Sequence, residues 1–136
     1  MSSSSLDDLG KLILRLTIGI LLLMHGIAKI LHGIGPIESM VIARGLPAFL
    51  AWFVYVGEVL APLLLIIGVY TRLGGVLIAI NMVIAIVLAH SSQIWHLGAS
   101  GGWRLELQGL FLFGGLAVAL LGAGRHSLSG TGGRLN

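Results

Sequence analysis

Cysteine is absent from this chain of 136 residues, and charged residues make up only 10% of it. Without cysteine the chain can form no disulfide, no thiolate nucleophile and no cysteine-ligated iron–sulfur cluster. The eight basic residues are scattered rather than gathered in a stripe, so we expect no nucleic-acid partner. No histidine and carboxylate share a helix at the spacing of metal ligands, so we expect no metal site.

Hydrophobic residues make up 57% of the chain and are concentrated in four runs of 18 to 25 residues. A helix needs about 20 apolar residues to cross a hydrocarbon layer of about 30 Å. Each run therefore predicts one membrane span. The predicted fold class is an all-α membrane protein, a four-transmembrane-helix up-down bundle. The predicted spans are 12–31, 46–70, 73–90 and 105–123.

The remaining segments predict how the spans are connected. Residues 1–10, with four serines, are expected to form a disordered tail, and the Gly- and Ser-rich residues 124–136 a flexible one. Only Thr71 and Arg72 separate the second run from the third, which predicts a tight antiparallel turn. The segment His32–Gly45 has apolar residues at helical spacing, and it predicts a short interfacial helix between helices 1 and 2.

Basic residues near the helix ends predict the orientation in the membrane. Four spans place both termini on one side, which then carries five basic residues against three on the other. Because cytoplasmic segments carry the excess of Lys and Arg, we expect cytoplasmic termini. The five are Lys11, Arg15, Arg72, Arg125 and Arg134, and the three are Lys29, Arg44 and Arg104.

Glu58 stands near the centre of the second run, where a charged group costs roughly 3 kcal/mol on insertion scales. Pro62 has no N–H and leaves the carbonyl of Glu58 without its helical partner. Irregular backbone at this depth is tolerated only beside protein or a wet cavity. The combination predicts a polar site at the membrane midplane. A structural ion pair, or a protonated carboxyl that only locks the bundle, stays open as the alternative.

The first run supplies candidate partners for Glu58. Arg15, His25 and Lys29 lie on or beside one stripe of the helix, at 100° per residue. At a rise of about 1.5 Å per residue, His25 lies about 5 Å and Lys29 about 11 Å outward from the run's centre, whereas Arg15 lies about 10 Å inward. We therefore rank His25 first, Lys29 second and Arg15 third. The alternative for Arg15 and Lys29 is that they only snorkel from the helix ends.

The later runs add three further candidates for substrate binding, beside Arg15 and Lys29. Asn81 lies at the centre of the third run, where the alternative is a hydrogen-bonded strut between helices. His90 follows nine residues later, so the two point to opposite faces of a regular helix and do not form one site by spacing alone. Glu106 enters the fourth run from the outer side. It either joins an outward-facing polar cluster or is an exposed interface residue.

Short motifs follow one another along the chain, from about Leu12 to Leu128. They are Arg15-Leu16 with Gly19, His25-Gly26-x-x-Lys29, Gly45-x-Pro47, Glu58, Gly68-x-x-Thr71-Arg72 and Leu121-Gly122-x-Gly124-Arg125-x-Ser127-Leu128. In this order and spacing they resemble the DoxX family of small four-helix bacterial membrane proteins. The chain departs from the family at Leu60-Ala61-Pro62, where a second glycine pair is common, and at Ser129, where an aspartate is common.

The resemblance implies a multi-pass protein of the bacterial cytoplasmic (inner) membrane. By association with thiosulfate–quinone oxidoreductase subunits and redox-stress complexes, it also implies electron or sulfur chemistry near a quinone, with no cofactor bound covalently. The chain would then be an oxidoreductase subunit that acts with a redox partner protein. Glu58 and His25 would be the catalytic residues that handle protons, and Lys29 would steer an anionic substrate.

Two other functions stay open, and with them the question of whether the chain is an enzyme. A non-catalytic scaffold would recruit partner proteins through exposed loop residues such as Trp95 and Trp103. A carrier of a small solute or of protons would need a homo-oligomer, because four helices are few for a transport path.

Overall fold

The computed structural model describes residues 3–136, and this part of the chain is helical, apart from its connecting segments. No strand forms in it, and its strand-type pairing is limited to an isolated bridge between Leu97 and Trp103. The helices follow one another as α1 (Ser3–His32), α2 (Gly35–Ala43), η1 (Ala48–Phe53), η2 (Val56–Leu60), α3 (Ala61–Ile67), α4 (Thr71–Ala85), η3 (Ile86–His90), η4 (Ser91–Gln93) and α5 (Glu106–Leu121).

Several of these elements join end to end into long apolar helices. Among the described residues, three stretches are long and apolar enough to cross a membrane: Ser4–His32, Ala48–Ile67 and Thr71–Gln93. The last apolar helix, α5, has 16 residues, fewer than the roughly 20 that a span needs. The all-α prediction is confirmed, and a membrane protein fits these helices. The fourth span and the interfacial position of α2 stay predictions.

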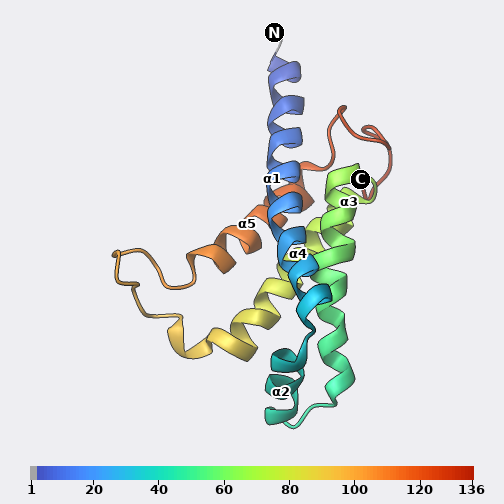
Figure 1. Cartoon of the computed structure of the whole chain (residues 1–136). Helices are drawn as coiled ribbons and strands as arrows, with labels where there is room; N and C mark the ends of the chain where they lie inside the picture. The colour runs from blue at the N-terminus through green and yellow to red at the C-terminus, as the bar shows by residue number, and fades with distance from the viewer. Residues whose placement is uncertain (1–2) are drawn as a thin grey trace.

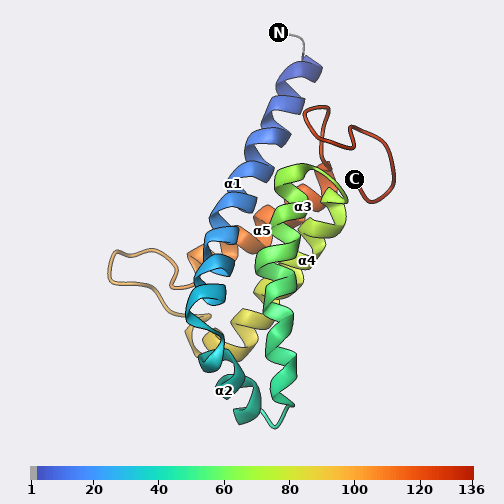
Figure 2. The same cartoon turned by 45° about the vertical axis from the view of Figure 1, so that its right-hand side comes forward.

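Figures 1 and 2 show how the helices are arranged in space. The stretch Ala48–Ile67, which joins η1, η2 and α3 end to end, is called the second rod. The helix α1 runs alongside this second rod, α4 lies beside it, and α5 crosses behind at an oblique angle. The short α2 sits at the end of the bundle opposite the N-terminus, and the loop before α5 projects sideways. Both described ends of the chain lie toward the same end of the bundle.

The core is built from side chains of four helices. Its buried side chains come from α1, α3, α4 and α5, whereas a smaller separate cluster lies under α2. The main cluster comprises Ile18, Leu22, Ala61, Leu65, Ile78, Met82, Phe111 and Val118, and the smaller one Ile34, Val41 and Ala51.

The N-terminal tail differs from the expectation. The helix α1 begins at Ser3, so the predicted disorder over residues 1–10 is wrong for residues 3–10, while Met1 and Ser2 lie outside the described part. Asp8 is buried and accepts a hydrogen bond of 3.1 Å from the backbone N–H of Arg125, whose Nε also lies 3.4 Å from the carboxylate. This contact with the other end of the chain stabilises a first turn that its serines disfavour.

The C-terminal segment also differs from the flexible tail that was expected. It folds back over the turn between α3 and α4, where the N–H of Leu128 donates to the carbonyl of Ile67 at 3.2 Å. Asn136 is buried there, and its side-chain oxygen accepts from the hydroxyl of Thr71 at 3.2 Å. Arg72 Nε donates to the Asn136 carbonyl at 2.9 Å. The segment therefore has fixed partners that its Gly- and Ser-rich composition does not reveal.

Glycine allows direct backbone contact between α1 and the second rod. A methyl group added at Gly26 would collide with the carbonyl group of Glu58, and one at Gly19 would lie 3.1 Å from the carbonyl oxygen of Pro62. Small residues at helix contacts let two backbones approach closely, as is common in membranes. Gly26 therefore fixes how near α1 can come to Glu58.

The variant Gly26→Ala tests this contact. Because the added methyl has no room, we expect it to lower the free energy of unfolding by about 1–3 kcal/mol. Thermal unfolding in mild detergent, followed by circular dichroism, measures the effect. Gly10→Ala is the matched control in the same helix, since its methyl would meet open space and alanine favours a helix. Equal melting temperatures of the two variants would contradict the proposed role of Gly26.

Candidate functional site

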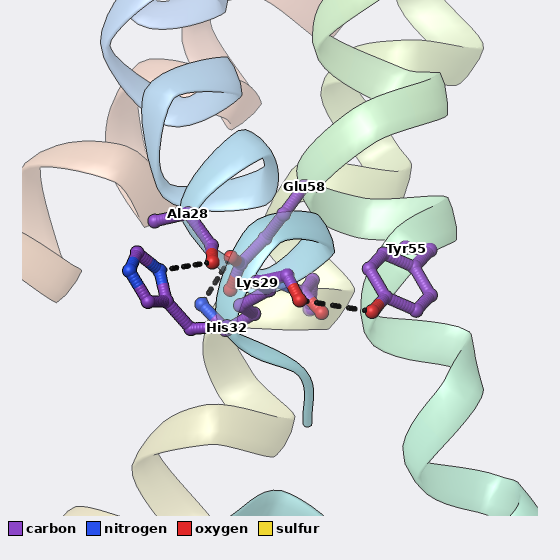
Figure 3. A network of polar contacts seen from close by, with 6 residues as sticks. Ala28, Lys29, His32, Tyr55 and Glu58 are labelled. Atoms are coloured by element: carbon purple, nitrogen blue, oxygen red, sulfur yellow. Dashed lines mark hydrogen bonds and ion pairs between the residues drawn. The ribbon is translucent and has the colours of Figure 1, made fainter. Parts of the chain in front are cut away.

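Glu58 is buried, and its carboxylate forms an ion pair with the ammonium group of Lys29 (Figure 3). The Glu58 side chain is 8% exposed and that of Lys29 is 26% exposed. The amide nitrogen of Asn81 lies 3.5 Å from the second carboxylate oxygen, a long contact. Tyr55 donates from its hydroxyl to the carbonyl of Lys29 at 3.2 Å. The site thus joins α1, the second rod and α4.

The partner of Glu58 is Lys29, so the prediction that ranked His25 first is wrong. Side chains on a helix lean toward its N-terminus. The long Lys29 side chain therefore reaches back along α1 to the depth of Glu58. The ring of His25 instead packs edge-on against Phe111 of α5, with ring centroids 5.8 Å apart.

The backbone irregularity expected near Glu58 takes the form of a π turn. In η2 the N–H of Ala61 donates to the carbonyl of Val56, five residues back, and Pro62 stands just beyond. Because proline offers no N–H, the regular α-helical ladder cannot continue through it. The carbonyl oxygen of Glu58 lies against Gly26. π turns are found frequently at functional sites.

A cavity of about 420 Å³ adjoins the ion pair. Most of its wall is apolar, with contributions from α1, α2, the second rod, α4, η3 and α5. A few polar side chains interrupt the apolar wall. They are His25, Lys29, Glu58, Asn81, His90 and Gln108. Five of the seven predicted site residues therefore share one cavity.

Asn81 and His90 line this cavity together, although a regular helix would point them to opposite faces. The difference arises in η3, a π segment that spans Ile86–His90. Each residue of a π turn advances by less than the 100° of an α-helix, so His90 comes round toward the side of Asn81. Composition gives no signal for this turn, so spacing alone could not place both residues on one cavity.

Gln108 is a cavity residue that was not among the predicted ones. Its amide nitrogen lies 3.3 Å from Nε2 of His90, and so it links α5 to η3. The available signal was a polar residue near the start of the apolar run 105–123, two positions after Glu106. Glu106, which was predicted instead, is exposed at the start of α5 and does not line the cavity.

Arg15 lies away from the cavity and is almost fully buried. Its guanidinium donates to the carbonyls of Leu65 at 2.7 Å and Ile66 at 3.0 Å, and to the carbonyl of His126. The last carbonyls of a helix have no hydrogen-bond donors within that helix. At the end of α3 the guanidinium of Arg15 supplies these donors. The structure therefore gives Arg15 a bracing role and does not bring it to the predicted binding site.

The helix α2 forms one part of the cavity wall and is held in place by Arg44, the residue that follows it. Ile37, Met40 and Val41 face the cavity. Arg44 donates from its guanidinium to the carbonyls of two residues in η3, Val87 at 3.0 Å and Leu88 at 3.3 Å. The short helix is thus attached to the π segment that carries His90.

These features define a helical membrane protein with a polar site inside its bundle. The sequence profile of the DoxX family matches residues 10–91, more than half of the chain, so the chain belongs to the DoxX family. The matched part includes Lys29, Glu58, Asn81 and His90 and excludes Gln108.

One curated relative is similar over part of its length. It is the Bacillus subtilis (strain 168) protein named "Putative oxidoreductase CatD", 34% identical over 80 residues, which are 59% of this chain and 59% of that protein. The chain therefore matches about six tenths of the relative's length. No solved structure matches the chain.

The ion pair predicts a non-additive double variant. Lys29→Met leaves the Glu58 carboxylate buried without a counter-charge, so we expect it to lower the free energy of unfolding by about 3 kcal/mol at neutral pH. Lys29→Met combined with Glu58→Gln removes both charges and should return stability to within about 1 kcal/mol of the wild type. Unfolding by SDS titration in mixed micelles measures the wild type, both single variants and the double variant, as a double-mutant cycle requires. If the losses of the two single variants add up in the double variant, the two charges do not interact.

Proposed function

We propose that this protein is the quinone-linked subunit of a membrane oxidoreductase, with the quinone bound in the cavity beside Glu58 and Lys29. The observation that carries the proposal is the cavity of about 420 Å³ whose apolar wall is interrupted by a buried ion pair. Sites for small ligands are typically concave, mostly apolar and provided with a few polar groups, at roughly 300–1,000 Å³. The name of the Bacillus subtilis relative, an oxidoreductase, agrees with this class of reaction.

The residues present fit such a ligand. The apolar wall, with Leu22 and Phe111 among its members, suits the faces of an aromatic ring. Lys29 has an ammonium group that can donate a hydrogen bond to a ring oxygen, and Glu58 has a carboxylate that can hold a proton. A bound quinone supplies an acceptor for two electrons and two protons. The electrons would come from a redox partner protein, because this chain has no cysteine for a dithiol or an iron–sulfur cluster.

The geometry allows Lys29 to change partner. Its side chain is partly exposed where it lines the cavity, so its ammonium group can turn from the Glu58 carboxylate toward a ligand oxygen. In this proposal a carboxylate oxygen of Glu58 holds a proton on its way to the ligand, and His25, on the same cavity wall, passes protons to it.

We further propose that the chain crosses the bacterial cytoplasmic membrane four times, with α5 as the fourth span and α2 at the interface. Both described ends of the chain lie toward one end of the bundle, as an even number of crossings requires (Figures 1 and 2). That end carries the larger share of the basic residues, which favours cytoplasmic termini.

Quinol formation in membranes that contain the protein and its electron donor tests the function. Glu58→Gln cannot exchange a proton at neutral pH, so we expect the rate to fall by about 100-fold. His25→Ala should lower it as well. Glu106→Gln is the matched control, because this carboxylate is exposed and outside the cavity. Wild-type rates in both cavity variants would refute the proposed role.

A second candidate function is a scaffold, and one observation favours it. The loop before α5 projects from the bundle, and its Trp95 is 92% exposed. A partner that binds the wild type and Glu58→Gln equally, but is lost when residues 94–104 are exchanged for a Gly/Ser loop, would support docking without chemistry. A partner whose binding depends on Glu58 would argue against it.

A further inference from the structure

His90 and Gln108 meet on the cavity wall, and one atom of this pair has no partner. The Gln108 amide nitrogen lies 3.3 Å from His90 Nε2, so it donates to that ring nitrogen. In a neutral ring the remaining proton is then on Nδ1. His90 Nδ1 is buried and has no hydrogen-bond partner in the described part of the chain. Buried polar atoms in proteins are nearly always paired, so this nitrogen needs an explanation.

The pair is separated from the Glu58 site along the cavity. Asn81 contacts Glu58 and lies in α4, which continues directly into η3 and His90. The two residues are nine positions apart, which corresponds to at most roughly 13 Å along the axis of α4 and η3. The cavity wall between them is apolar, with Ile84, Ala85 and Leu88. The cavity therefore has polar groups at two places with apolar surface in between.

We propose that His90 and Gln108 form a second polar end of the ligand site. The cavity then takes a flat ring with an oxygen atom at each of two opposite positions. This inference rests on the proposed function and narrows it to para-quinones and their quinols. Such a ring with one hydrogen bond at each end spans roughly 11 Å between the two protein atoms. This length fits within the separation of at most roughly 13 Å along α4 and η3.

Each member of the pair has a defined task. His90 donates from Nδ1 to the ring oxygen that is remote from Lys29. Gln108 is a positioning residue, because its bond to Nε2 keeps the proton on Nδ1 and orients the ring of His90. A ligand with a single oxygen can engage the Lys29 end but leaves the His90 end unpaired.

Binding of two matched ligands to the full-length protein in nanodiscs tests the proposal. Menadione is a bicyclic ring with two opposite carbonyls, and 1-tetralone is a bicyclic ring of similar size with one. Equilibrium dialysis, corrected by empty nanodiscs, gives both dissociation constants. The absence of cysteine means that menadione forms no thiol adducts with this chain. We expect the wild type to bind menadione about tenfold more tightly than 1-tetralone.

Two variants of His90 distinguish the roles of its two ring nitrogens. His90→Asn places an amide near the position of Nδ1, and His90→Gln places one near Nε2. We expect His90→Gln to weaken menadione binding about tenfold and 1-tetralone binding less than twofold. His90→Asn should keep menadione binding within about threefold of the wild type. Circular dichroism checks folding, and if His90→Gln does not fold, Gln108→Leu provides the same readout from another helix.

The outcomes distinguish this inference from the proposed function. If His90→Gln, or Gln108→Leu in its place, binds menadione as tightly as the wild type, the second polar end is refuted, while the quinone site at Glu58 and Lys29 remains. If the wild type binds menadione no better than empty nanodiscs do, the quinone site and its second end are both refuted.

Discussion

The ion pair between Lys29 and Glu58 is the interaction on which the inner part of the bundle depends. Removing two charges from water costs several kcal/mol for each ion, and only close pairing with further polar contacts offsets this cost. The structure meets the condition by bringing α1 against the second rod at Gly26, where no side chain separates the backbones. Asn81 adds a contact from α4. Three helices are thereby fixed relative to one another around a group that has no favourable place in lipid.

The cavity exists because two helices depart from regular geometry beside it. The π turn η2 carries Glu58, and the π turn η3 carries His90. A widened turn changes which side of the helix the following residues face. Irregular backbone within a membrane is tolerated where protein or a cavity covers it, and both turns line the same cavity. The two irregular turns and the cavity therefore occur together at this end of the bundle.

The two cations of α1 that share one stripe have different tasks because they meet different partners. Lys29 meets a carboxylate and is partly exposed to the cavity, so its contacts can change when a ligand binds. Arg15 meets backbone carbonyls at the end of α3 and in the C-terminal segment, and it is almost fully buried. A guanidinium has five donors in a fixed arrangement, which suits a brace among several carbonyls. One end of the bundle is therefore braced, and the other holds the adaptable site.

The sequence by itself determined the helical class and the long apolar elements, and it singled out Glu58, because apolar run length and a charge within it are local properties. It also proposed His25, Lys29 and Arg15 as partners of that residue. It could not determine that Lys29 is the partner, since this depends on side-chain direction and on the contact between His25 and Phe111. Only the tertiary structure brought His90 to the cavity and joined it to Gln108, because a π turn and the crossing of α5 leave no pattern in composition or spacing. The same holds for both described ends of the chain, whose order comes from contacts between residues more than 60 positions apart.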